Sequence, residues 1–207
     1  TISAAGVVNI AGSLTVAGSA VGGASAIGGL DDVLMDATNF TNSLLIQTES
    51  DGSAPTTGTL SSASDNTGIG NNVFNALTSG TYNTAIGTMA LESVTSGKYN
   101  TGVGTEALAD ITTTDGHTAF GHGALRRHAV GIGNTAIGFL AIASTTNNAK
   151  YNTAVGYTSM YALTEGDENV ALGYYSLRNT TTGSDNLAIG SNALYANTTG
   201  ERNIALG

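Results

Sequence analysis

The chain has 207 residues, of which only 10% are charged, and its formal net charge is −9. It contains no Cys, which excludes a disulfide framework and zinc–thiolate sites. Only six Lys and Arg stand against 15 Asp and Glu, and they form no basic cluster. Because a phosphate backbone is bound by clustered positive charge, we expect no nucleic-acid partner.

Residues 1–29 are uncharged, but Ser, Asn, Thr and Gly interrupt every apolar run, so we expect no membrane span there. The chain also starts without Met or a basic segment, which argues against a signal peptide. Val8-Asn-Ile10 is echoed by Leu14-Thr-Val16, and alternation of apolar and polar residues predicts short strands. We expect residues 1–29 to form a β-shaft segment that ends in a Gly-rich joint.

Residues 30–65 have the character of a connector. The apolar run Leu44–Ile46 predicts a strand, preceded by a short turn or helical loop. A loop rich in Gly, Ser and Thr follows and contains Pro55. The carboxylates of Asp31, Asp32 and Asp36 could bind calcium, but no known calcium-loop pattern accompanies them, so we expect no metal.

Residues 66–207 repeat one five-residue motif nine times. Its steps are 17 residues long, with one step of 18 residues between Asn134 and Asn152. A fixed period of this kind predicts a stack of like coils, here eight coils and a partial ninth that ends at Gly207. Because Gly207 ends a repeat after five residues, we expect the chain to be a piece of a longer protein.

The motif and its surroundings show a regular pattern of side-chain size. With the first residue as position 0, positions +3 and +8 are large and apolar, +2 is Gly or Ala, +7 is usually small, +4 is always Gly and +14 is usually Gly. Frequent Gly disfavours a helix and suits turns between strands. We expect two strands per coil, with +3 and +8 inside and the small residues where another chain approaches.

Position 0 is Asn in eight of the nine repeats. Coils stacked at the inter-strand spacing would place these side chains above one another, where they can hydrogen-bond along the stack. His117 is expected to interrupt this ladder. The predicted ladder residues are Asn66, Asn83, Asn100, Asn134, Asn152, Asn169, Asn186 and Asn203.

The stretch Asn186-Leu-Ala-Ile-Gly-Ser-Asn-Ala-Leu194 resembles the head repeats of trimeric autotransporter adhesins. It is more similar still to the longer-period repeats of bacteriophage tail fibres. The resemblance covers residues 66–207 and implies a left-handed parallel β-roll in which three chains pack around one axis. The expected fold is therefore all-β, a trimeric parallel β-roll or β-solenoid of 17-residue coils preceded by an intertwined β shaft. One coil alone buries too few large side chains to order itself, which agrees with a homotrimer.

The resemblance implies a structural segment of a phage tail fibre that acts in host attachment on the virion tail. Expected partners are further copies of the chain, an upstream tail protein and a host cell-surface glycan or protein. One alternative is the head of a trimeric adhesin on a bacterial cell surface. Another is an ice-binding solenoid, because Thr67 to Thr153 form a regular column at +1, although we expect that column to point inward with +3.

Five tyrosines in the last coils are candidate receptor contacts. Their rings can stack on sugars and their hydroxyls can hydrogen-bond, whereas packing between coils is the structural alternative. The candidates are Tyr157, Tyr161, Tyr174, Tyr175 and Tyr195.

The remaining polar residues suggest no chemistry. His117, His122 and His128 could form a three-nitrogen metal site on a three-fold axis, but their spacing matches no metal motif, so we expect a solvated polar patch and no cofactor. A Gly-x-Ser-x-Gly nucleophile motif and a paired-acid arrangement are both missing from the sequence. We therefore expect a protein that is not an enzyme.

Overall fold

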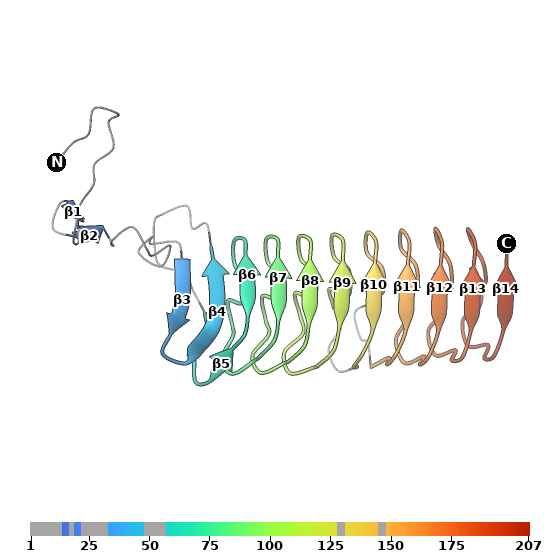
Figure 1. Ribbon diagram of the computed structural model, residues 1–207. Helices are drawn as coiled ribbons and strands as arrows, with labels where there is room; N and C mark the ends of the chain where they lie inside the picture. The colour runs from blue at the N-terminus through green and yellow to red at the C-terminus, as the bar shows by residue number, and fades with distance from the viewer. Residues whose placement is uncertain (1–13, 17–18, 22–32, 48–56, 128–130, 145–147) are drawn as a thin grey trace, which may run out of the picture.

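The structure, a computed structural model, describes residues 14–16, 19–21, 33–47, 57–127, 131–144 and 148–207. Within these residues it is all-β and contains no helix. The repeats form a row of coils whose parallel strands lie side by side along one wall (Figure 1). This arrangement confirms the predicted β-solenoid with 17-residue coils.

Each repeat contributes one strand of three residues at positions +1 to +3. Neighbouring strands pair in parallel without a register shift, so equivalent residues lie beside one another. The strands are β6 (Thr67–Ile69), β7 (Thr84–Ile86), β8 (Thr101–Val103), β9 (Thr118–Phe120), β10 (Thr135–Ile137), β11 (Thr153–Val155), β12 (Val170–Leu172), β13 (Leu187–Ile189) and β14 (Ile204–Leu206).

The longer repeat keeps the same register. Thr135 pairs with Thr153 across the 18-residue step, as Thr residues do across the 17-residue steps. Asn134 Nδ2 bonds the carbonyl of Ala149, 15 residues on, where the other ladder residues bond a carbonyl 14 residues on. The extra residue is therefore accommodated before Ala149, outside the sheet.

The sheet begins before the first repeat. β3 (Val33–Ala37) and β4 (Phe40–Ile46) form an antiparallel hairpin, joined by a turn at residues 38–39. The strand predicted at Leu44–Ile46 is therefore present, and a strand and a turn precede it where a short turn or helical loop was predicted. Asn39 lies in the tight connection with a φ of 67°, a conformation that Asn adopts more easily than most residues. β4 then pairs in parallel with β6 and with β5 (Ala63–Ser64), which places this hairpin at the start of the solenoid sheet.

A separate hairpin lies near the N-terminus. β1 (Leu14–Val16) and β2 (Ser19–Val21) pair antiparallel, with Leu14 opposite Val21. The predicted strand at Leu14–Val16 is thus present, whereas the one predicted at Val8–Ile10 lies outside the described residues. Intertwining of this segment with other chains stays a prediction.

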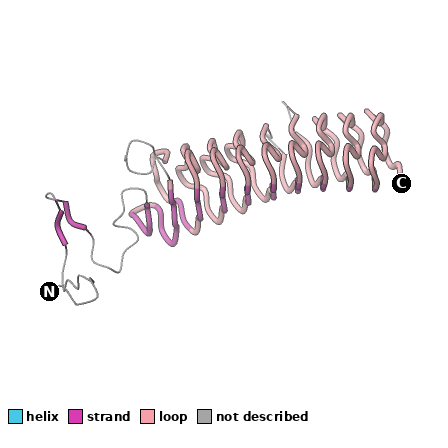
Figure 2. Tube along the Cα trace, turned by 90° about the horizontal axis from the view of Figure 1, so that it is seen from above, coloured by secondary structure: helices cyan, strands magenta, loops and turns pink. Residues whose placement is uncertain are grey.

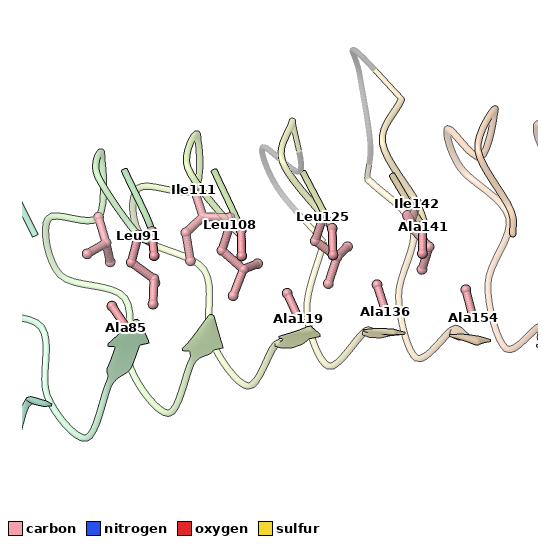
Figure 3. Packing of buried hydrophobic residues seen from close by; sticks show 14 of the residues in the cluster. Ala85, Leu91, Leu108, Ile111, Ala119, Leu125, Ala136, Ala141, Ile142 and Ala154 are labelled. Carbon is pink, nitrogen blue, oxygen red and sulfur yellow. The ribbon is translucent and has the colours of Figure 1, made fainter. Parts of the chain in front are cut away.

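The interior of each coil is filled from two sides (Figure 3). Small residues at +2, such as Ala85, point inward from the strand and meet the large residue at +8, such as Leu91. Position +11 completes this core with Leu77, Val94, Ile111 and Leu163. The expected contact of +2 and +7 with another chain is wrong, because both columns are buried within one chain.

Position +3 was expected inside the coil, and that expectation is also wrong. Ile69, Ile86 and Ile137 are 39–41% exposed, whereas the neighbouring residue at +2 is fully buried in β7 and β10. The reason is the alternation of side chains along a strand, which places +1 and +3 on the face opposite to +2. The coil is too narrow to hold a large residue from the strand beside the one at +8, so it takes the small residue inside.

The second strand expected in each coil is absent from the described residues, where loops and turns fill the coil between successive strands (Figure 2). Positions +6 and +8 adopt positive φ, as in Met89 (58°) and Leu91 (52°), which a β-strand does not allow. The left-handed conformation costs a residue other than glycine roughly 1–2 kcal/mol. Stacking offsets this cost through backbone hydrogen bonds, such as Leu91 N to Ala107 O at 3.0 Å.

The two glycine columns serve different purposes. Gly87 at +4 has a φ of 126°, and an added Cβ would lie 2.7 Å from the backbone of the equivalent glycine in the next coil. Gly80 at +14 instead lies so near the next coil that a Cβ would be 2.6 Å from the Gly97 carbonyl oxygen. The +4 position therefore needs glycine for its backbone conformation. At +14 glycine suits the limited space beside the next coil, although the coil that begins at Asn100 has Thr114 there.

Candidate functional site

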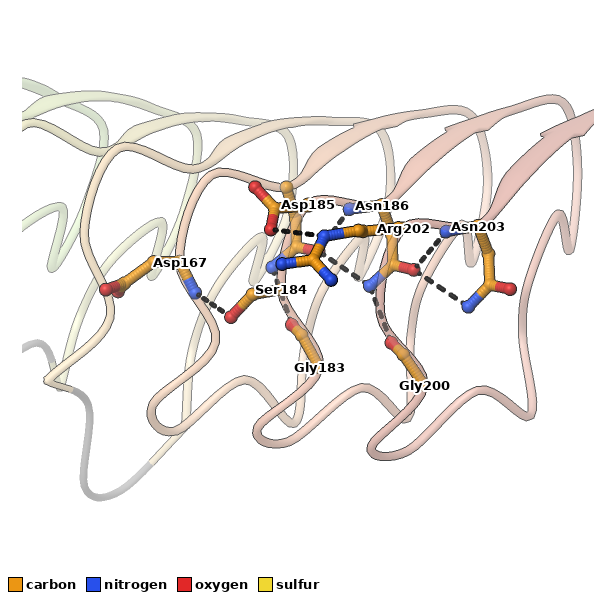
Figure 4. A network of polar contacts seen from close by, with 9 residues as sticks. Asp167, Gly183, Ser184, Asp185, Asn186, Gly200, Arg202 and Asn203 are labelled. Atoms are coloured by element: carbon orange, nitrogen blue, oxygen red, sulfur yellow. Dashed lines mark hydrogen bonds and ion pairs between the residues drawn. The ribbon is translucent and has the colours of Figure 1, made fainter.

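The Asn ladder is present and is buried. The Asn83 carboxamide oxygen accepts from both the backbone N–H and the side-chain amide of Asn100, at 3.0 and 3.1 Å. Its own amide donates to Asn66 Oδ1 at 3.0 Å and to the Gly97 carbonyl at 2.8 Å. The same bonds recur near the C-terminus, where Asn203 donates to Asn186 (Figure 4). The ladder therefore joins each coil to both of its neighbours by hydrogen bonds, as predicted.

Two residues other than Asn belong to this column. Ser43 of β4 accepts the Asn66 N–H at 2.9 Å and so stands at the head of the ladder. His117 does not interrupt it: Nε2 donates to the Gly131 carbonyl at 3.0 Å, and Nδ1 accepts from the Asn134 N–H at 3.2 Å. Burial lowers the pKa of His117 to about 4, so the ring is neutral at pH 7. The expectation of a solvated polar patch is wrong for this residue.

The outer face of the sheet carries two columns of side chains, at +1 and +3. We call this surface the sheet face. Its +3 column is apolar and is about 40% exposed over most coils. Its +1 column is Thr from Thr67 to Thr153 and then Val170, Leu187 and Ile204. Exposed apolar patches that extend over several residues usually mark a contact surface, and this column is such a patch.

The candidate tyrosines gather on one surface. Tyr157 and Tyr174 stack with ring centroids 5.6 Å apart, and Tyr175 contacts both of them and Tyr195. The stack continues to Phe139 and His122, at centroid distances of 5.1 and 5.2 Å. We call the connected rings of His122, Phe139, Tyr157, Tyr174, Tyr175 and Tyr195 the aromatic strip. Its rings at +5 are nearly parallel, with interplanar angles of 10–19°.

Tyr161 joins this surface through a cation. The Arg178 guanidinium lies 5.2 Å from the Tyr161 ring centroid and 5.1 Å from that of Tyr175. A hydrogen bond with the Tyr175 side chain is the main cause that raises the pKa of Tyr174. All five predicted tyrosines therefore belong to one continuous surface, and their role as receptor contacts stays a prediction.

The described residues hold no cluster of three or more His, Cys, Asp or Glu side chains that could bind a metal. His122 lies 3.9 Å from Glu106 and stacks on Phe139, whereas Glu106 pairs with Arg126 at 2.7 Å. His117 is in the ladder, away from solvent. His128, Asp31 and Asp32 lie outside the described residues.

Comparison of the chain with protein-family models, with curated proteins and with solved structures gives no match. Across the part of the chain that the structure describes, no helix has the length and apolar character of a membrane span.

Sequence reasoning missed three features of these surfaces. A signal existed for each, because each occupies a fixed column: apolar residues at +11, Thr at +12, and Phe139 with His122 at +5. The Thr column forms a second ladder, in which Thr78 Oγ1 donates to Thr95 O at 3.0 Å and Thr95 Oγ1 to Thr112 O at 3.1 Å. The +11 column was hidden by its change to Thr180 and Asn197 in the last coils.

Proposed function

We propose that this chain is a structural segment of a phage tail fibre, in which three copies pack through their sheet faces and the assembly acts in host-cell attachment. The observation that supports this most is the +3 column, most of whose apolar side chains are about 40% exposed in the single chain. The resemblance of the repeats to tail-fibre sequences adds the biological setting. The virion tail is the expected location.

The energetics of the sheet face favour self-association. Fully burying a Val, Leu, Ile or Phe side chain gains about 1.5–3 kcal/mol, so covering one that is 40% exposed gains roughly 1 kcal/mol. The seven +3 residues that are at least 38% exposed give on the order of 7 kcal/mol per chain. Association costs roughly 4–15 kcal/mol, so the +3 column alone is near the threshold. A closed trimer helps, because each chain then contacts two neighbours and the +1 column is covered as well.

The assembly can be tested by sedimentation of the purified chain and of two matched variants. Ile137→Asp places a charge on the sheet face, whereas Phe139→Asp places one on the aromatic strip of the same coil. The two side chains are similarly exposed, at 41% and 40%. We expect a trimer for the wild type and for Phe139→Asp, and dissociation for Ile137→Asp. A folded wild-type monomer, judged by sedimentation with circular dichroism, would contradict the proposal.

The attachment role predicts that the purified assembly binds to whole bacterial cells. The alternative, the head of a bacterial trimeric adhesin, predicts instead that it binds extracellular-matrix proteins coated on a surface. Both partners can be offered to the same labelled preparation. Binding to the matrix proteins alone would favour the adhesin, and binding to neither would contradict an attachment role.

An ice-binding solenoid is a second candidate, and one observation favours it. The Thr column from Thr67 to Thr153 lies on the outward face with +3 and not inside the coil, so the earlier argument against it is wrong. The two uses of the face exclude each other, because a trimer covers the threonines that ice would contact. Thermal hysteresis in a monomeric preparation would support ice binding.

A further inference from the structure

We propose that the aromatic strip, together with Tyr161 and Arg178, binds an acidic carbohydrate, that is, an oligosaccharide whose sugars carry carboxylates. The inference rests on the proposed role in attachment and names the class of receptor. It depends on the state of Arg178, on the geometry of the rings and on the distribution of charge along the strip.

Arg178 is held in place without a carboxylate. Arg126 and Arg202 each pair with a carboxylate, Glu106 and Asp185, whereas the described residues offer Arg178 only the Asn179 carboxamide oxygen, at 3.3 Å. The rings of Tyr161 and Tyr175 fix its guanidinium by cation–π contact. A guanidinium held this way is suited to recognise a carboxylate, because little side-chain freedom is lost on binding.

The rings near Arg178 differ from those at the other end of the strip. Between His122 and Tyr174 the rings are stacked, so their faces are covered by one another. Tyr175 breaks this order, because it is tilted by 52° to Tyr157 and by 51° to Tyr195, and its ring centroid lies only 3.8 Å from that of Tyr174. Tyr174 and Tyr195 are nevertheless 48% and 37% exposed, so their rings are accessible to sugar C–H groups. Both of these exposed rings contact Tyr175, whose ring in turn contacts the Arg178 guanidinium.

Charge along the strip favours an anionic ligand. In the last three complete coils, positions +5, +6 and +9 hold Tyr, Ser, Thr, Asn and Arg178 but no Asp or Glu. This is notable in a chain with 15 acidic residues and a net charge of −9. A carboxylate bound at Arg178 therefore meets no repulsion from these columns, and a neutral sugar would gain only from the rings.

The length of the strip favours a chain of sugars over a single one. His122 and Tyr195 belong to coils four steps apart, and at about 4.8 Å per step the strip extends over roughly 19 Å. Several sugar units can lie along this distance. If three chains assemble, three such strips would bind one polysaccharide surface with increased avidity.

The test uses two acidic probes, an oligogalacturonate and an oligosialate, and the methyl ester of the oligogalacturonate as the neutral match. Binding of the assembled chain is measured by calorimetry. We expect the acidic forms to bind at least tenfold more tightly than the ester. Arg178→Gln should remove this preference, whereas Arg127→Gln, which removes an equal charge from an exposed position, should keep it. Tyr174→Leu should weaken the binding of all the probes.

Three results would overturn the inference. These are equal binding of the acid and its ester, equal losses in Arg178→Gln and Arg127→Gln, and no binding of either acidic probe. Loss of the trimer in Arg178→Gln or Tyr174→Leu would also overturn it, because the strip would then be a contact between chains. Cells that still bind an assembly unable to bind the probes would leave the attachment role standing and reject only the acidic carbohydrate.

Discussion

His117 should make the solenoid sensitive to acid. Its Nε2 donates to the Gly131 carbonyl and its Nδ1 accepts from the Asn134 N–H, so a second ring proton would face another N–H group. Burial lowers the pKa to about 4 in the folded chain, while the hydrogen bond to the Gly131 carbonyl and the nearby Asp115 oppose this only in part. An unfolded His has a pKa of about 6.5. The unfolded chain therefore takes up the proton first as the pH falls.

The size of the acid sensitivity follows from the difference between the pKa of His117 in the folded chain and its pKa in the unfolded chain. Above about pH 6.5 neither state is protonated and the contribution of His117 to stability is fully present. It declines by about 1.4 kcal/mol per pH unit as the pH falls from 6.5 to about 4, and then levels off. The loss over this range is on the order of 3 kcal/mol. Most domains are only 5–15 kcal/mol stable, so this loss is large.

The assay is guanidinium unfolding followed by circular dichroism at several pH values between 7 and 4. His117→Asn restores the residue of the other rungs, and the carboxylates common to both chains cancel when the two are compared. As the pH falls from 7 to 4, we expect the free energy of unfolding of His117→Asn to rise by about 3 kcal/mol relative to that of the wild type. Asn169→His, which puts imidazole on another buried rung, should add a similar acid sensitivity.

A stability difference between wild type and His117→Asn that does not change with pH would refute the reasoning. It would mean that the ring is protonated in place without loss of its ladder bonds. An acid sensitivity in Asn169→His alone would show that the principle holds for the ladder but not for the native histidine.

Four further variants probe the coil, and thermal or guanidinium unfolding measures each. Asn83→Ala leaves the buried Asn100 N–H and Gly97 carbonyl without their partner and removes one of the two bonds to Asn66 Oδ1, so it should cost about 3–5 kcal/mol, whereas half-buried Asn203→Ala should cost about 1 kcal/mol. Gly104→Ala combines a φ of 128° with a Cβ 2.7 Å from the next coil and should cost more than about 2 kcal/mol. Met89→Asn should gain roughly 0.5–1 kcal/mol, because its φ is 58° and Asn already occupies this position in two other coils. Destabilisation by Met89→Asn, or tolerance of Asn83→Ala or of Gly104→Ala, would contradict these arguments.

The sequence predicted the solenoid, its period and the Asn ladder because each depends on a residue type recurring at a fixed step. It could not decide which face of the strand is inside. Alternation along the strand separates Ile86 from Ala85, but size alone suggested that Ile86 is buried. The structure reverses this, since Leu91 fills the interior from the opposite wall.

The turns were hidden from the sequence for a different reason. Leu and Met have no preference for positive φ, so Leu91 and Met89 gave no sign of the left-handed conformations that replace the expected second strand. Coil stacking imposes those conformations, and stacking is a property of several repeats together. Four of the five tyrosines were found because they share the columns +5 and +9, and Tyr175 was found because it adjoins Tyr174. Phe139 and His122 continue the +5 column, but as different residue types they were overlooked.

The unbroken register has a consequence for how such chains can vary. The strand of each coil pairs with the preceding strand and with the following strand in the same register, as in the Thr67–Thr84 and Thr84–Thr101 pairs. Recombination that deletes or duplicates 17 residues would therefore join matching edges and alter the length by about 4.8 Å per unit. Related genes can differ in reach by whole repeats while their sequence-specific surfaces, such as the tyrosines of the last coils, are inherited intact.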